Sequence, residues 1–483
     1  MTEHSAGHPP ARHAGLIIAV LAFGSLCAAL MQSLVIPIQG ELPTLLGTSA
    51  ANASWVVTAT LLGAAVAMPV TGRLADIVGK KPVLVVSAAI LLAGSLVCAV
   101  SSSFPLVLTG RVLQGMAMGF IPVAISLAKE VAPPHLTNTA VAGISATLGV
   151  GGALGLPLAA WIAQDFDWHT LFWLSAVLAA LILVGTATLL PHVRDEHPAR
   201  LDVVGAVGLA VGLVAVLVGV SKGNEWGWSS FATLGLLVGG VLVLLAWGAF
   251  ELRHDEPLVD LRTTARRPVL MTNLAALLIG FGMMAQSIVV PQLLEMPSET
   301  GFGLGQTILQ AGLWMAPAGI VMMLFAPVSS RLLTTIGGRR TLSLGAVVIG
   351  VGYIVAVFLT SAPWQLMLAT CVASAGVGIG YAAMPSLILE NVPASEAASS
   401  VGVNALMRSM GTTVAGAVMA VVLTSRTVPL APGIEIPAEG AFRMCFVIGA
   451  GAAFAGALVA LLVPRRAAAR DDRPADELEA TTV

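Results

Sequence analysis

The chain has 483 residues, of which 57% are hydrophobic and only 10% are charged, and its formal net charge is −2. Its mean hydropathy is +0.93. Soluble globular proteins carry about 25% charged residues, so a chain this apolar cannot cover its own surface in water. The composition predicts an integral membrane protein whose surroundings are the lipid bilayer. The small net charge gives no reason to expect a nucleic-acid partner.

Long apolar segments follow the polar stretch 1–13, which we expect to be a cytoplasmic tail. The first of them exceeds the apolar core of a signal peptide, so we expect it to be retained. A membrane-spanning helix needs about 20 apolar residues. Polar residues divide the chain into fourteen such segments, at 14–36, 52–71, 83–100, 105–127, 139–163, 170–190, 203–221, 231–250, 268–290, 307–326, 341–360, 364–388, 401–424 and 441–463.

The positions of the basic residues orient these spans. If the N-terminus is cytoplasmic, 18 of the 23 Lys and Arg residues fall in tails or loops on the cytoplasmic side, and only Lys222 and Arg426 fall in outer loops. Cytoplasmic loops are enriched in basic residues, and one missed or invented helix would invert every later loop. The pattern favours fourteen spans with both termini in the cytoplasm.

An internal repeat divides the chain. The segment Pro69–Lys81 has a degenerate echo at Pro327–Arg340, and both are predicted to be cytoplasmic loops. We therefore expect an all-α membrane protein of two six-helix bundles related by a pseudo-twofold axis, with two inserted central helices. The bundles are 14–190 and 268–463, the inserted part is 191–267, and 464–483 is expected to be a disordered cytoplasmic tail. Two such halves around a central cavity are a transporter architecture, expected here as a monomer.

Two motifs carry a resemblance to a known family. The segment Gly72-Arg73-Leu74-Ala75-Asp76-Ile77-Val78-Gly79-Lys80-Lys81 resembles the signature loop of the major facilitator superfamily, and Leu108-Thr109-Gly110-Arg111-Val112-Leu113-Gln114-Gly115 resembles its second motif. The fourteen spans are similar to its drug:proton antiporter branch. The resemblance implies a secondary active transporter of the bacterial inner membrane that exports small antibiotic, drug or metabolite molecules by alternating access. It implies exchange for protons, with no cofactor beyond the proton gradient.

The first motif implies a cytoplasmic gate formed by Gly72, Arg73, Asp76, Gly79, Lys80 and Lys81. In the family the matching aspartate interacts with a helix terminus and an arginine of the opposing half. The physical reason is that a carboxylate is stabilised at a helix N-terminus.

Arg111 lies within the fourth predicted span, with Gln114 on the same face three residues later. An arginine inside a membrane helix is expensive and faces a cavity or a partner. Arg408, with Asn404 four residues before it, is the counterpart in the second half. We expect the transport pathway to include Arg111, Gln114, Arg408, Asn404, Gln32 and Asn273, with Gln286 and Gln310. Methionines 283, 284, 315, 322 and 323 suit a large amphiphilic substrate.

The fifth span contains Gly151, Gly155 and Pro157, which we expect to form a helix-packing hinge because small residues let helices approach closely. The family's antiporter motif places its proline one residue earlier. A larger departure is Met31, which stands where the branch commonly has an aspartate as a proton site, and no Asp or Glu lies deep in any predicted span. A uniporter or symporter that imports a nutrient on the same fold therefore remains an alternative.

Enzyme chemistry is not indicated. The eight histidines lie in tails or loops, and the cysteines Cys27, Cys98, Cys371 and Cys445 lie singly in apolar stretches without a metal-ligand pattern. We expect no metal site and no catalytic residue. Because deep acids are missing, a neutral or anionic substrate is favoured over a cationic one.

Overall fold

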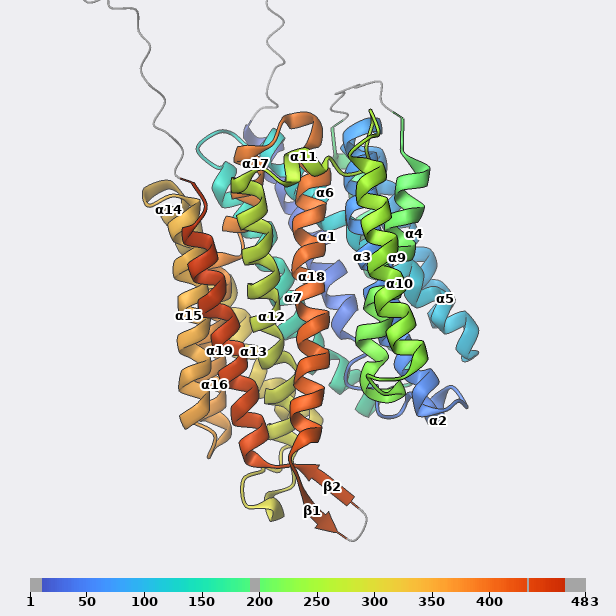
Figure 1. The fold of residues 1–483 in the computed structure, drawn as a ribbon, viewed down its shortest axis with the longest axis vertical. Helices are drawn as coiled ribbons and strands as arrows, with labels where there is room; N and C mark the ends of the chain where they lie inside the picture. Colours follow the sequence, from blue (N-terminus) through green and yellow to red (C-terminus); the bar gives the residue numbers. More distant parts are fainter. Residues whose placement is uncertain (1–10, 192–199, 432–433, 465–483) are drawn as a thin grey trace, which may run out of the picture.

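The computed structural model describes residues 11–191, 200–431 and 434–464 (Figure 1). Within these ranges, 14 helices are long and apolar enough to cross a membrane. The predicted all-helical membrane fold with fourteen spans is therefore confirmed. The expectations for the terminal tails fall mainly outside the described residues.

The N-terminal half consists of the helices before the inserted pair. Its fourth span is divided, because α5 and α6 are joined by a 3₁₀ turn at Ala117–Gly119. Its helices are α1 (Ala11–Ser33), the short α2 (Leu42–Leu45), α3 (Ala50–Val78), α4 (Lys80–Ala99), α5 (Phe104–Met116), α6 (Phe120–Val131), α7 (Thr137–Asp165) and α8 (His169–Leu189).

Two long helices and a short one follow, and then the C-terminal half. The inserted helices are α9 (Val203–Trp226) and α10 (Phe231–Glu251), followed by α11 (Leu261–Thr264). The C-terminal half contains α12 (Arg267–Glu295), α13 (Ile308–Leu324), α14 (Ala326–Thr335), α15 (Gly338–Phe358), α16 (Pro363–Gly380), α17 (Ala383–Asn391), α18 (Ala397–Ser425) and α19 (Glu439–Leu461). A hairpin of β1 (Thr427–Ala431) and β2 (Ile434–Pro437) joins the last two.

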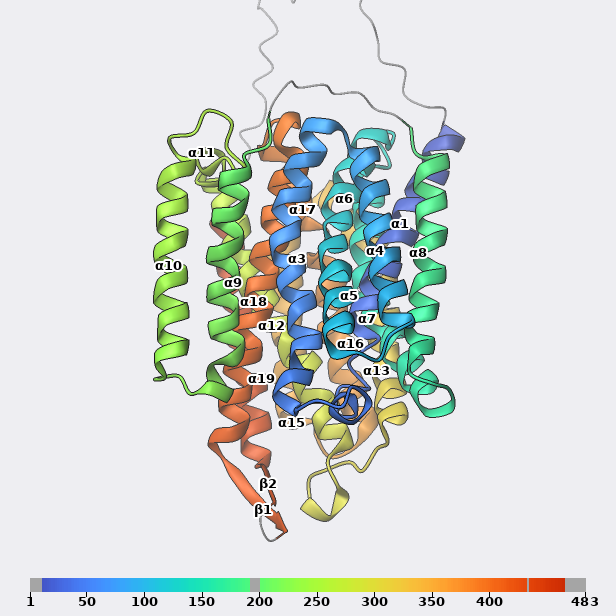
Figure 2. The ribbon, with the colours of Figure 1, turned by 90° about the vertical axis from the view of Figure 1, so that its right-hand side faces the viewer.

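Each half has its own apolar core, drawn mainly from its own helices. The halves meet along two pairs of helices, α3 with α18 and α7 with α13. Helix α9 lies beside both α3 and α18, whereas α10 packs on the far side of α9 at the periphery (Figure 2). We call the face with the Gly79 and Gly337 turns the inner face, and the face with the β-hairpin the outer face.

The structure corrects two predicted boundaries. The motif expected to form a cytoplasmic loop is mostly helical: α3 continues to Val78, and the chain breaks only at Gly79, whose φ of 94° favours glycine. Helix α9 extends to Trp226, so Lys222 lies in a helix and not in an outer loop. Both helices are longer than the apolar segments from which they were predicted, because hydropathy detects only the part of a helix that crosses the hydrocarbon.

The topology can be tested with single cysteines at two exposed positions, Thr334 on the inner face and Glu435 in the hairpin. An impermeant thiol reagent is expected to label Glu435→Cys in intact cells and Thr334→Cys only in everted vesicles. The unsubstituted protein gives the background from the native cysteines. Labelling of Thr334→Cys in intact cells would contradict the predicted orientation.

Candidate functional site

On the inner face, the carboxylate of Asp76 joins the two halves. Its Oδ1 accepts a hydrogen bond from the backbone N–H of Ala398 (3.0 Å), and its Oδ2 accepts one from the N–H of Ser399 (2.8 Å). Both donors belong to the first turn of α18, where N–H groups have no partner within the helix. Because Asp76 is only 5% exposed, its charge is held by the positive end of α18 rather than by water. We call this arrangement the inner contact.

Two glycines allow the backbones of α3 and α18 to touch beside Asp76. A Cβ placed on Gly72 would lie 2.5 Å from the carbonyl oxygen of Ala398. On the opposite helix, a Cβ on Gly402 would lie 2.3 Å from the carbonyl oxygen of Met68. Any side chain at either position would push the helices apart. Gly72 therefore allows the backbones of α3 and α18 to approach closely, and it is not part of a flexible loop.

Further contacts between the halves were not predicted from the sequence. The ammonium of Lys129, in the last turn of α6, donates to the carbonyl oxygen of Leu389 in α17 (2.5 Å). The hydroxyls of Thr139 in α7 and Ser330 in α14 are 2.8 Å apart. The Lys129 contact places a cation near the negative end of a helix of the other half. Its sequence signal is a basic residue at the cytoplasmic end of the fourth predicted span.

The basic residues of the motif act in different places. Lys80 pairs with Glu130 at the end of α6, and Lys81 donates to the carbonyl oxygen of Leu190 (2.7 Å), so both brace the N-terminal half internally. Arg73 faces the other half, because it and Glu396 line a hollow on the inner face together with Asp76 and Leu258, and their charges interact. We call this space the inner hollow. Lys80 and Lys81 of the motif thus stabilise the N-terminal half, whereas Arg73 lies at the boundary between the halves.

Arg111 is enclosed within the N-terminal half at 1% exposure. Its Nε donates to the carbonyl oxygen of Val56 in α3 (3.1 Å), and one Nη donates to Gln114 Oε1 (2.7 Å). A longer contact of 3.5 Å reaches the carbonyl oxygen of Met31 in α1. Gln114 in turn donates to Ser95 of α4 (3.0 Å). Arg111 therefore joins three helices to α5 through neutral oxygens, and it faces partners rather than the central cavity.

A narrow cavity lies between the halves. Residues of α6, α7, α17 and α18, together with Tyr381, line a cavity of about 270 Å³. Arg408 is the cation at its wall, with its guanidinium 4.4 Å from the centre of the Tyr381 ring. Asn404 also lines the cavity and donates to Asn273 Oδ1 (2.9 Å). Arg408 and Asn404 are thus brought together, with Asn273 behind them.

Other predicted lining residues lie elsewhere. Gln114 is bound to Arg111, and half-buried Gln32 is not part of this cavity wall. Gln286 donates to Ser374 (3.1 Å) within the C-terminal half. The expectation for Gln310 is wrong, because this exposed residue forms the capping box of α13 with Thr307. None of the five methionines lines the cavity, and Met323 is 48% exposed.

The glycines of α7 serve two neighbours. Gly151 and Gly155 face α1, where an added Cβ would lie 2.7 Å from Ala29 Cβ and 1.9 Å from Ser33 Oγ. Pro157 faces the other half, because an added Cβ on Gly312 of α13 would lie 3.1 Å from its Cα. One helix thus packs tightly on its own half on one side and against the opposing half on the other.

Substitutions at the inner contact should loosen the first turn of α18. Asp76→Asn removes the charge, so we expect amide hydrogen exchange at residues 398 and 399 to become about five- to ten-fold faster, as befits the loss of about 1 kcal/mol at a partly buried helix N-terminus. Gly72→Ala should act in the same direction by forcing the backbones apart. Gly143→Ala is the matched control, because an added Cβ there meets nothing within 4 Å. Unchanged exchange in Asp76→Asn would show that the contact does not hold the halves together.

Curated relatives of this chain include transporters. A "Probable actinorhodin transporter" of Streptomyces coelicolor is 30% identical over 393 residues, which cover 77% of this chain and 66% of that protein. A "Multidrug resistance protein B homolog" of Mycobacterium tuberculosis is 27% identical over 390 residues, covering 78% and 70%. "Multidrug transporter protein MdtP" of Bacillus subtilis is 24% identical over 418 residues, covering 86% and 75%. The match thus spans about two thirds of the Streptomyces protein, and less of some other relatives.

Solved structures show the same fold. A human organic anion transporter superposes with a TM-score of 0.65 at 17% identity, covering 94% of this chain and 100% of that one. A proton:xylose symporter gives 0.64 at 15% identity, covering 94% and 96%. The sequence profile described as "Major Facilitator Superfamily" matches residues 21–416 and 272–482, which is most of the chain. The chain belongs to the major facilitator superfamily.

Proposed function

We propose that the protein exports small amphiphilic molecules of the antibiotic, drug or secondary-metabolite type from the cytoplasm, by alternating access and in exchange for protons. The observation that carries the proposal is the cavity between the halves, which has a mainly apolar wall, one arginine and no acid. Such a wall suits an apolar body that carries a neutral or anionic polar group. The names of the actinorhodin and multidrug relatives support the same class of cargo.

Alternating access requires that the inner contact break and re-form. Asp76 and the glycines beside it close the boundary between α3 and α18 on the inner face. In the proposed cycle, substrate enters from the cytoplasm when this contact is open and leaves outward after it has closed. We therefore assign Asp76, Gly72 and Arg73 to the cytoplasmic gate, with Lys80 and Lys81 bracing the helices that carry it.

Import by a uniporter or symporter is the second candidate. It is favoured by Met31, because the aspartate that the fourteen-helix branch commonly has at this position, a candidate proton site, is missing. The backbone of residue 31 still contacts Arg111, but it offers a carbonyl oxygen that does not titrate. Proton exchange therefore needs a carboxyl group somewhere else in the chain.

A pair of buried acids at the inner ends of α9 and α10 could supply that group. Asp202 caps α9 through Oδ1, which accepts from the Gly205 N–H (2.8 Å), while its Oδ2 has no hydrogen-bond partner in the described part of the chain. An added Cβ on Gly205 would lie 2.3 Å from Asp202 Oδ2 and 2.3 Å from Glu251 Oε1. The distance between these two carboxylate oxygens therefore cannot exceed the sum of those two distances. Two carboxylates this close are stabilised by sharing a proton.

This acid pair also has a route to the gate. Of the groups that act on the Glu251 carboxylate, Asp202 is the charged one. The others are neutral donors, namely the side chain of Trp247 and the backbone N–H groups of Leu258 and Val259. Leu258 lines the same inner hollow as Arg73 and Asp76. Protonation of the pair would change how Glu251 holds the 258–259 segment, and hence the wall of the gate. We therefore propose the pair as the proton-exchange group.

Transport measurements test the cargo and its direction. Cells that express the protein should accumulate less of an amphiphilic anionic antibiotic, and a protonophore should abolish the difference. Arg408→Gln is expected to reduce export of anionic compounds about ten-fold or more, as expected when a charge-assisted contact is lost, and to affect neutral compounds less. Arg426→Gln, which changes an exposed arginine at the outer face, is the control. Uptake of a nutrient in place of export would support the import alternative.

The acid pair is tested by Asp202→Asn and Glu251→Gln. Asparagine caps a helix as well as aspartate does, so the first change removes the charge and keeps the cap. In proteoliposomes both variants should retain exchange of labelled for unlabelled substrate, but lose accumulation driven by a pH gradient. Glu256→Gln, which alters a carboxylate on the same segment that accepts from the Arg200 N–H, is the control. Normal gradient-driven accumulation in both variants would exclude the pair as the proton-exchange group.

A further inference from the structure

The inserted helix α9 occupies the seam between the two halves. Its leucines Leu209, Leu213 and Leu217 form one buried cluster with Ala65 of α3 and with Val403 and Leu406 of α18. Helix α10, by contrast, contacts α9 and turns large apolar side chains such as Phe231 (93% exposed) away from the protein. Only α9 of the inserted pair is therefore placed to hold α3 and α18 together (Figure 2).

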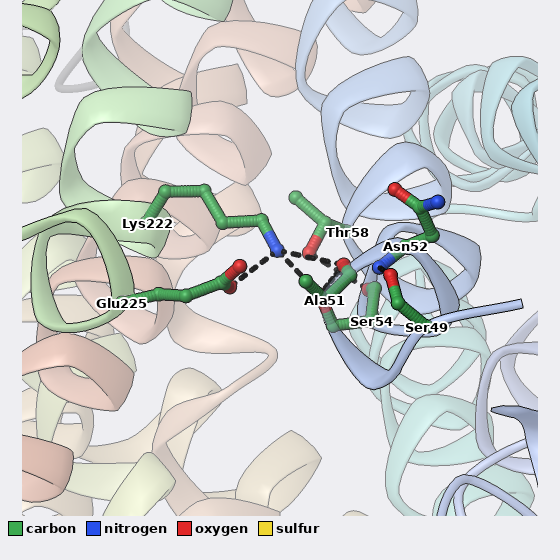
Figure 3. A network of polar contacts seen from close by, with 7 residues as sticks. All are labelled: Ser49, Ala51, Asn52, Ser54, Thr58, Lys222 and Glu225. Carbon is green, nitrogen blue, oxygen red and sulfur yellow. Dashed lines mark hydrogen bonds and ion pairs between the residues drawn. The ribbon is translucent and has the colours of Figure 1, made fainter.

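The outer end of α9 is bound to the N-terminal half by a buried lysine. Lys222 is 2% exposed, and its ammonium donates to the carbonyl oxygen of Ala51 (3.3 Å) and to the hydroxyl of Ser54 in α3 (Figure 3). The ammonium also lies 4.9 Å from the centre of the Trp55 ring, and it pairs with Glu225 at 2.8 Å. A cation buried at this depth is costly unless several groups satisfy it, and here α3 supplies most of them.

The same end of α9 is bound to the C-terminal half two residues later. The amide nitrogen of Asn224 donates to the carbonyl oxygen of Ala417 in α18 (3.3 Å). The amide oxygen of Asn224 accepts from the indole N–H of Trp228 (2.8 Å), which fixes the orientation of the amide. One turn of α9 thus contacts α3 through a cation and α18 through a single neutral hydrogen bond.

The position of this turn complements that of the inner contact. The residues of α3 that bind Lys222 are separated from Asp76 by about 33–38 Å along the helix, and Ala417 is about 29 Å from Ala398 along α18. The inner contact therefore fastens one end of this helix pair, and α9 bridges the other. When the halves separate at the outer face, at least one of the two links made by α9 must break.

From these contacts we propose that the turn of α9 carrying Lys222 and Asn224 is the outer latch of the transporter. Charge-assisted bonds are about twice as strong as neutral ones, so the link through Lys222 persists and the link through Asn224 breaks. Helix α9 then moves with the N-terminal half, and its outer end slides along α18 as the outer face opens. Lys222 and Asn224 are positioning residues for this movement and need not touch the substrate. The inference rests on the proposed alternating access, but not on the cargo or on its direction.

Amide hydrogen exchange of the full chain in lipid nanodiscs tests the latch. In Asn224→Ala, exchange at the outer ends of α3 (50–58) and α18 (417–425) should become about five-fold faster, the effect of losing one neutral hydrogen bond. In the same variant, exchange at the inner ends (72–78 and 397–402) should become slower, because the population shifts toward the state that is closed inside and open outside. Lys222→Met should give the same reciprocal pattern, because α9 can then stay with α18 while α3 separates, and Lys222→Arg should restore part of the closed population. Asp76→Asn should give the opposite pattern.

The control is Arg443→Gln, which removes another cation paired with a glutamate on the outer face, in an exposed ion pair with Glu439. It should leave exchange unchanged at both ends. Faster exchange confined to the outer ends, without protection of the inner ends, would identify Lys222 and Asn224 as structural contacts only and overturn the proposal. A reciprocal pattern in a protein that exports no antibiotic would instead support the latch and reject the proposed cargo.

Discussion

The arrangement of the two halves depends on a carboxylate at the start of a helix. Asp76 satisfies two backbone N–H groups of α18 that have no other partner within that helix, and it does so where little water can reach. The interaction requires the two backbones to be in contact, which only glycine permits at positions 72 and 402. Charge and shape are therefore coupled, because a side chain at Gly72 would remove the carboxylate from its donors.

The internal repeat keeps the sequence pattern around the inner contact but not its carboxylate. In the echo, Ser330-Arg331-Leu332-Leu333-Thr334 aligns with the segment that ends at Asp76, so threonine takes the place of the acid. The Thr334 hydroxyl donates to the carbonyl oxygen of Arg331 in its own helix. On that side the halves are joined by Thr139 with Ser330 and by Lys129 with the Leu389 carbonyl. Within the described residues, the first of these related boundaries is held by a buried carboxylate, whereas the second is held by a pair of hydroxyls and by a lysine that donates to a backbone carbonyl.

Hydropathy and charge placement were sufficient for the number of spans, because lipid imposes a length on every helix and topology sorts the basic residues. They could not give helix ends, since α3 and α9 continue past the apolar segment. They also could not give partners. The i, i+3 spacing places Gln114 beside Arg111, and the two side chains are bonded. The other partners of Arg111 are backbone oxygens of α1 and α3, which no side-chain pattern encodes. Gln310 was misassigned because a capping glutamine and a cavity glutamine look alike in sequence.

Most of the buried charged residues lie near helix ends and not in the middle of the membrane. Asp76, Lys80, Asp202 and Glu251 lie within a turn or two of the inner ends of their helices, and Lys222 lies in the last turn or two of α9 at the outer end. Arg111 lies deeper, but its bonds are to neutral oxygens of its own half. Interactions that differ between conformations are therefore concentrated where the halves separate, while the central wall stays mainly apolar. A ligand shifts the equilibrium between the inward-open and outward-open states only when it binds one state more tightly than the other. Modest contacts at the helix ends are therefore enough to control this equilibrium, if the substrate in the cavity and the proton each bind one state more tightly.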